Sequence, residues 1–230
     1  MNLKPYLSDF LSLFFPKLCL HCREPLMGAE TFLCLHCQRL LPKTGYLSFQ
    51  DNAATDRFRG KIPVAKAVSY LYYNKGGVGQ KIVAEIKYRG NIRLGREIGR
   101  QLAEDLHSKG FFENVDFLVP VPLHPKKLKK RGFNQAEIIA QGVASVTKIP
   151  METTRLYRRK ANLTQTKKNV YERWKNADGI FSLRDPSVFA SKHVLLVDDV
   201  LTTGATLEAC AVRLLEIPQI KISLLTLAIA

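Results

Sequence analysis

The residues from Val194 to Thr206 combine the groups that would bind a sugar phosphate. Asp198 and Asp199 follow a run of four apolar residues, and a turn rich in hydroxyl groups comes next, made of Thr202, Thr203, Gly204, Ala205 and Thr206. The hydroxyls, the glycine and the N–H groups of a following helix suit a phosphate. The two carboxylates repel phosphate, but they accept hydrogen bonds from sugar hydroxyls or help to hold a hydrated Mg²⁺. The segment therefore predicts a site for a sugar phosphate with free hydroxyl groups.

A second cluster of reactive residues lies near the N-terminus. Four of the five cysteines form two C-x-x-C pairs, Cys19 with Cys22 and Cys34 with Cys37. This spacing predicts a tetrahedral zinc site, and four thiolates leave no open position, so the zinc would be structural. His21 and His36 are alternative ligands, although we favour the four cysteines. The metal would supply the folding energy of a module too small to build its own core.

The charge of the chain indicates an anionic partner. The net charge is +15, and the segment 124–175 holds fourteen Lys or Arg against three Glu. Such an excess of positive charge favours binding partners that carry negative charge, such as nucleotides, nucleic acid or an anionic membrane face. The apolar N-terminal stretch is interrupted by Pro5, Asp9 and Pro16, and the apolar C-terminus is only nine residues long. We therefore expect no membrane span and a cytoplasmic protein.

The hydrophobic pattern predicts the elements that must position these groups. Strands are expected at 67–73, from 117, near 155–159, before Asp198 and at the C-terminus. Helices are expected over 80–90, 92–108 and 134–147, and after Gly204, with Asn134 as a helix cap. Because strands alternate with helices, we expect an α/β fold with a mostly parallel sheet flanked by helices on both faces.

The segment VLLVDDVLTTGAT resembles the motif with which type I phosphoribosyltransferases bind phosphoribosyl pyrophosphate (PRPP). The resemblance implies the type I phosphoribosyltransferase fold and Mg²⁺ bound with PRPP. It also implies that Asp198 and Asp199 hold the ribose 2- and 3-hydroxyls. The 5-phosphate would lie against the turn, on Thr202, Thr203, Gly204 and Thr206.

Nearly the whole chain resembles the bacterial ComF family, which is linked to natural transformation. The resemblance is carried by the double C-x-x-C, by IKYRG, by PVPLH followed by RGFNQ, and by the PRPP motif. It implies a small zinc-ribbon-like module in front of the phosphoribosyltransferase domain. The basic segment after residue 154 also fits the R…T-Q-T…R…N…F spacing of the family, with Arg158, Gln165, Thr166, Arg173, Asn176 and Phe181.

Transfer of a phosphoribosyl group requires cations that stabilise the departing pyrophosphate and a lid that excludes water. The basic segment 124–175 could supply both. Our candidates for the pyrophosphate and the lid are Lys87, Arg131, Arg158, Arg159 and Gln165.

We expect three parts of the chain: a zinc-binding module over 1–43, a linker over 44–61 and the phosphoribosyltransferase domain over 62–230. Two functions remain open. The chain is a phosphoribosyltransferase with an unknown acceptor, or it is a non-catalytic accessory protein of DNA uptake that binds single-stranded DNA and a helicase-type partner. No segment specifies the acceptor.

Overall fold

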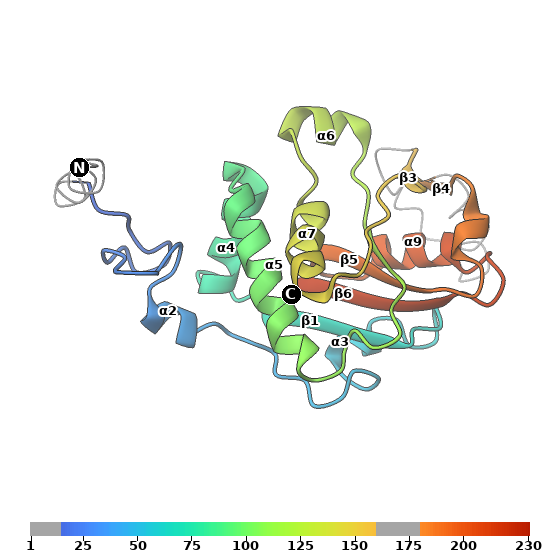
Figure 1. Ribbon diagram of the computed structural model, residues 1–230, viewed down its shortest axis with the longest axis horizontal. Coiled ribbons are helices and arrows are strands. Elements are labelled where there is room, and N and C mark those ends of the chain that lie inside the picture. Colours follow the sequence, from blue (N-terminus) through green and yellow to red (C-terminus); the bar gives the residue numbers. More distant parts are fainter. Residues whose placement is uncertain (1–14, 160–179) are drawn as a thin grey trace, which may run out of the picture.

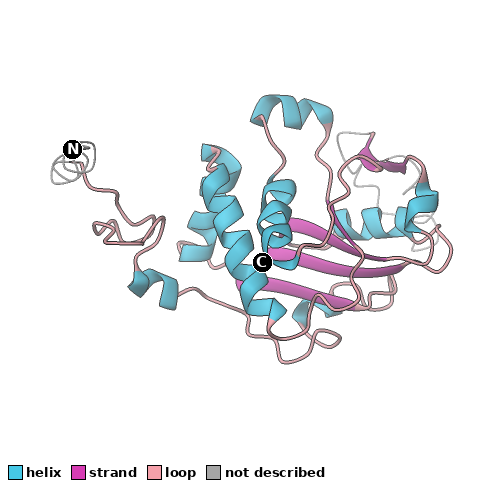
Figure 2. Cartoon of the chain, viewed as in Figure 1, coloured by secondary structure: helices cyan, strands magenta, loops and turns pink. Residues whose placement is uncertain are grey.

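The computed structural model describes residues 15–159 and 180–230. Strands and helices alternate along the domain, as the sequence predicts (Figures 1 and 2). The strands are β1 (Lys66–Tyr72), β2 (Phe117–Pro120), β3 (Leu156–Arg158), β4 (Phe181–Leu183), β5 (His193–Leu201) and β6 (Lys221–Ile229). The helices are α2 (Leu35–Arg39), α3 (Ala53–Asp56), α4 (Val78–Arg89), α5 (Ile92–His107), α6 (Pro125–Arg131), α7 (Gln135–Thr147), the 3₁₀ helix Pro186–Phe189 and α9 (Ala205–Leu214).

Four strands form one parallel sheet in the order β1-β6-β5-β2. Val197 of β5 lies opposite Leu225 of β6 and Pro120 of β2. The short strands β3 and β4 form a separate antiparallel pair. Because β5 lies inside the sheet and is flanked by parallel neighbours, its carboxyl end is a position where α/β proteins bind ligands.

Two apolar clusters cover the two faces of the sheet. Alternate residues of β5 enter different clusters: Leu195 and Val197 face α4, α5 and α7, whereas Val194 and Leu196 face the side of α9. Figure 2 shows the helices on the two sides of the strands. This alternation is the two-residue period of a strand, and it explains why the sequence before Asp198 is continuously apolar.

The segment 44–61, which the sequence predicts as a linker, packs on the domain. Asn52 caps α3 by accepting hydrogen bonds from the Ala54 and Thr55 N–H groups, and its own amide donates to the Ala67 carbonyl of β1. Phe58 is 1% exposed within the cluster on the α9 side. The segment therefore covers the edge strand β1 and contributes to the core.

Candidate functional site

Asp198 and Asp199 lie near the carboxyl end of β5, where they leave the strand toward opposite sides. Asp199 forms an ion pair with Lys87 of α4, with 3.0 Å between the Lys87 Nζ and Asp199 Oδ1 atoms. Asp198 is influenced by the charge of Arg158, which lies on β3. Since successive strand residues point to opposite faces, Asp199 faces α4 and pairs directly with Lys87, whereas Asp198 experiences the charges of both Lys87 and Arg158.

Asp198 is the more perturbed of the two carboxylates. Burial, together with the neighbouring charge of Asp199, raises the pKa of Asp198 to about 7. The Asp199 N–H group donates a hydrogen bond to the Asp198 carboxylate at 2.8 Å and opposes that rise, as do the charges of Lys87 and Arg158. A carboxyl group kept in a costly environment at the end of a strand is typical of a ligand-binding site.

The turn after β5 has the form of a phosphate cradle. Gly204 adopts a φ of +82°, and a Cβ atom there would lie 2.9 Å from the Phe58 ring, so the position requires glycine. Helix α9 begins directly after it, and Gly204, its cap residue, offers no side chain to the first N–H groups of the helix. The Thr202 and Thr203 side chains are exposed beside these groups. The turn can therefore present N–H and hydroxyl donors to an anion.

The predicted pyrophosphate and lid residues divide into three groups. Lys87 reaches the site itself through its ion pair with Asp199. Arg158 lies close enough to Asp198 to affect its pKa, and its guanidinium also lies 5.4 Å from the centre of the Phe181 ring. Arg131 is at the end of the exposed helix α6, and Arg159 lines a pocket beside β4 and α9. Gln165 lies outside the described residues.

The four predicted metal ligands converge. The sulfur atoms of Cys19, Cys22, Cys34 and Cys37 all lie within 4.8 Å of one another, and those of Cys22 and Cys34 are 3.7 Å apart. Zinc–sulfur bonds of about 2.3 Å in a tetrahedron require sulfur atoms about 3.8 Å apart, so the cluster fits a metal ion such as zinc. Neither His21 nor His36 belongs to the cluster found among the described residues. A bound metal ion would cross-link the two C-x-x-C segments and stabilise the module.

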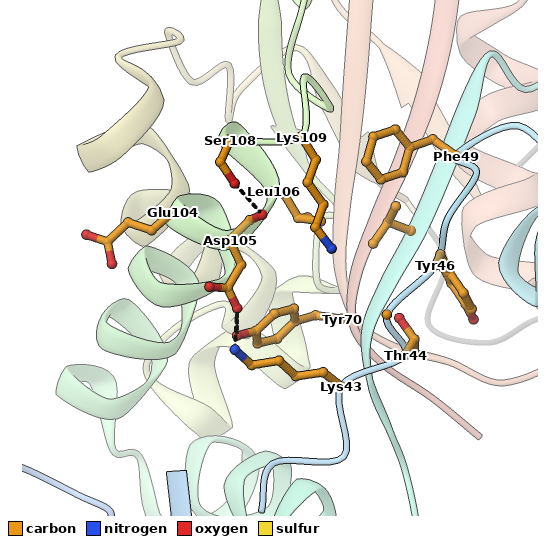
Figure 3. Close-up of a pocket in the computed structure, with 12 residues that line it drawn as sticks. Lys43, Thr44, Tyr46, Phe49, Tyr70, Glu104, Asp105, Leu106, Ser108 and Lys109 are labelled. Atoms are coloured by element: carbon orange, nitrogen blue, oxygen red, sulfur yellow. Dashed lines mark hydrogen bonds and ion pairs between the residues drawn. The ribbon is translucent and has the colours of Figure 1, made fainter. Parts of the chain in front are cut away.

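A separate pocket of about 400 Å³ lies between α5 and the segment 43–49 (Figure 3). At its rim the Asp105 carboxylate accepts hydrogen bonds from the Tyr70 hydroxyl and the Lys43 ammonium, each at 2.5 Å. Burial and the hydrogen bond to Asp105 raise the pKa of the Tyr70 hydroxyl. The residues that line the pocket come from three segments that are distant in the sequence, so no local sequence motif indicates it.

Residues 90–228 match the family model of the phosphoribosyl transferase domain. The matched region contains the β5–α9 turn and more than half of the chain. The chain therefore belongs to the phosphoribosyl transferase domain family.

Three curated relatives extend the similarity over most of the chain. The chain is 26% identical to Competence protein F of Haemophilus influenzae, over 91% of this chain and 96% of that protein. It is 28% identical to Competence protein ComFC of Bacillus subtilis, over 87% of this chain and 78% of that protein. It is 27% identical to DNA utilization protein YhgH of Escherichia coli, over 87% of this chain and 92% of that protein. These matches confirm the resemblance to the ComF family.

Helices long and apolar enough to cross a membrane are not found in the described ranges 15–159 and 180–230.

Proposed function

We propose that this protein binds PRPP together with Mg²⁺ at the carboxyl end of β5 and transfers its phosphoribosyl group to an acceptor during DNA uptake. The observation that carries the proposal is the juxtaposition of Asp198 and Asp199 with the start of α9. There the cap residue Gly204 has no side chain, and the Thr203 hydroxyl accepts a hydrogen bond from the first helical N–H group. The carboxylates suit the ribose hydroxyls, and the turn suits the 5-phosphate. The names of the competence relatives support the biological role.

In this proposal the chain's own residues provide binding and charge stabilisation. Thr202, Thr203 and Thr206 hold the 5-phosphate, together with the backbone of Gly204 and Ala205. Lys87 leaves Asp199 and approaches the pyrophosphate, and Arg158 contributes a second positive charge. Mg²⁺ would supply further neutralisation of the pyrophosphate oxygens when bound. Loss of pyrophosphate from C1 has an oxocarbenium-like transition state, so a protein nucleophile is not required.

The test of transfer is a screen for pyrophosphate release from PRPP and Mg²⁺ in the presence of candidate acceptors and of single-stranded DNA. Release that needs an acceptor and that disappears in the Asp198→Ala, Asp199→Ala double variant supports transfer. PRPP binding without release under any condition in the screen would contradict catalysis and leave PRPP as a bound effector.

A specific surface favours a second function, binding of single-stranded DNA. Helix α6 carries Lys126, Lys127, Lys129, Lys130 and Arg131, and none of its residues is buried. Figure 1 shows α6 standing away from the sheet at the end of two connecting segments. Such a projecting cationic element suits a phosphate backbone, and the relatives' names place them in competence and DNA utilization. A gel shift that weakens steeply with salt supports DNA binding, and a shift that does not respond to salt would contradict it.

A further inference from the structure

The cysteine module and the candidate PRPP site contact opposite ends of one helix. Near its start, the Lys81 Nζ atom donates a hydrogen bond of 3.1 Å to the carbonyl oxygen of His21, which lies between Cys19 and Cys22. Near its end, Lys87 pairs with Asp199 at 3.0 Å. The 12-residue helix α4 therefore connects the cysteine module to the Asp199 carboxylate of the candidate PRPP site, through a hydrogen bond near its start and an ion pair near its end.

The module packs on this helix as part of one core. Cys19, Leu33 and Cys37 are buried in the same apolar cluster as Val78 and Ile82 of α4. Two of the four metal ligands are thus core residues of the main domain. Figure 1 shows the module on the side of the domain where α4 lies. The end of the module also pairs with β1, where the Pro42 carbonyl accepts a hydrogen bond from the Tyr72 N–H group. Because Cys19 and Cys37 share the apolar cluster with α4, we expect a change in the metal cluster to disturb the packing of the helix.

The start of α4 gives this contact a physical consequence. Its cap residue, Gly77, makes no side-chain hydrogen bond to the helix. The first turn is instead held by tertiary contacts: the module on one side, and on the other the carbonyl of Tyr72, which Gly79 approaches so closely that a Cβ atom would lie 2.7 Å from it. Metal bound to Cys19 and Cys22 fixes the intervening His21 carbonyl, and that carbonyl fixes Lys81. Loss of the metal removes one of the contacts that hold α4 in place.

We propose that Lys81 is a positioning residue that couples metal binding in the cysteine module to PRPP binding at Asp199. The inference rests on the proposed PRPP site. The metal-loaded module holds α4 in the position from which Lys87 can reach the pyrophosphate of PRPP, so PRPP binds more tightly to the metal-loaded chain. Linkage is reciprocal, and PRPP must therefore tighten metal binding by the same factor. A purely structural zinc site, independent of the ligand site, would show no such factor.

The experiment measures zinc retention in the full-length protein. A chromophoric chelator selective for zinc is titrated with Mg²⁺ alone and with Mg²⁺ plus saturating PRPP, and PRPP binding is measured separately by calorimetry. We expect PRPP to raise the chelator concentration that removes half of the zinc by about fivefold, at the lower end of typical couplings. Lys81→Met, which keeps the apolar stem, should lose this factor, and Lys81→Arg should restore most of it. Lys75→Met, at an exposed lysine just before α4, is the matched control and should keep it.

The outcomes separate the two ideas. If PRPP binds but leaves zinc retention unchanged, or if Lys81→Met keeps the full factor, the coupling is wrong and the proposed function stands. If calorimetry detects no PRPP binding to the zinc-loaded wild-type chain, the proposed function fails and the coupling fails with it. If Lys81→Met lowers zinc affinity by the same factor with and without PRPP, so that the fivefold effect of PRPP remains, Lys81 only stabilises the module and the coupling is wrong.

Discussion

Replacement of Asp198 by asparagine should stabilise the fold and at the same time abolish PRPP binding. Burial and the charge of Asp199 raise the pKa of Asp198 to about 7, whereas an aspartate in an unfolded chain titrates near pH 4. The folded state therefore holds a proton that the unfolded state has lost, and the free energy of unfolding falls as the pH rises from about 4 to about 7. Above pH 7 the full cost of the buried charge is present.

The size of the effect follows from the shift. Three pKa units correspond to a ceiling of about 4 kcal/mol. Asp198 is partly exposed, and the asparagine oxygen accepts the hydrogen bond from the Asp199 N–H group less strongly than a carboxylate, so we expect about 2 kcal/mol. For a protein of this size, that gain raises the Tm by roughly 4–8 °C.

The assay is thermal unfolding of the wild-type chain and the Asp198→Asn variant at a series of pH values, with PRPP binding measured at pH 8. The gain in Tm should be full at pH 8 and shrink steadily as the pH falls to about 4, below which Asp198 becomes protonated in both states. Asp199→Asn is the comparison: it relieves the repulsion on Asp198 but also breaks the ion pair with Lys87, so its gain in Tm should be smaller than that of Asp198→Asn. A Tm of Asp198→Asn that is lower than that of the wild type at pH 8, or a gain that is the same at every pH, would refute this reasoning.

Three further predictions address the turn, the metal and the basic helix. Gly204→Ala should lower the free energy of unfolding by about 1–3 kcal/mol and weaken PRPP binding, because φ at this position is positive and the Phe58 ring occupies the space of a Cβ atom. Denaturant unfolding measures the loss of stability, and an unchanged midpoint would contradict it. Metal analysis should find about one zinc per chain, and a chelator should lower the Tm of the whole domain because Cys19 and Cys37 are core residues; an unchanged Tm after zinc removal would count against this. Replacement of Lys126 and Lys127 by Gln should weaken single-stranded DNA binding and reduce its salt slope by roughly one to two, whereas an unchanged slope would show that α6 does not meet the phosphates.

The sequence predicts the sheet and the principal helices well, for identifiable reasons. The strand before Asp198 is a continuous apolar run because β5 is buried on both faces. The helix over 92–108 has a strongly amphipathic pattern and is α5, and Asn134 caps α7 as expected by accepting a hydrogen bond from the Ala136 N–H group. The cysteine spacing likewise predicts the cluster of four sulfur atoms.

The sequence does not predict the features that depend on contacts between distant segments. Residues 44–61 are polar and lack periodicity, yet Phe58 from this segment packs against Gly204 of the candidate phosphate turn. The pairing of Lys87 with Asp199 requires α4 to lie across the end of β5, which no local pattern indicates. The opposite orientations of Asp198 and Asp199 follow from the strand period, but the cations that meet each carboxylate follow only from the fold.

The most direct test of the account is calorimetric titration of PRPP with Mg²⁺ into the wild-type chain and into the Asp198→Ala, Asp199→Ala double variant. The variant must unfold cooperatively, which shows that it is folded. We predict saturable binding of one PRPP per wild-type chain and its loss in the double variant. The absence of binding to the wild type, or equal binding to both proteins, would contradict the assignment of a PRPP site to the carboxyl end of β5.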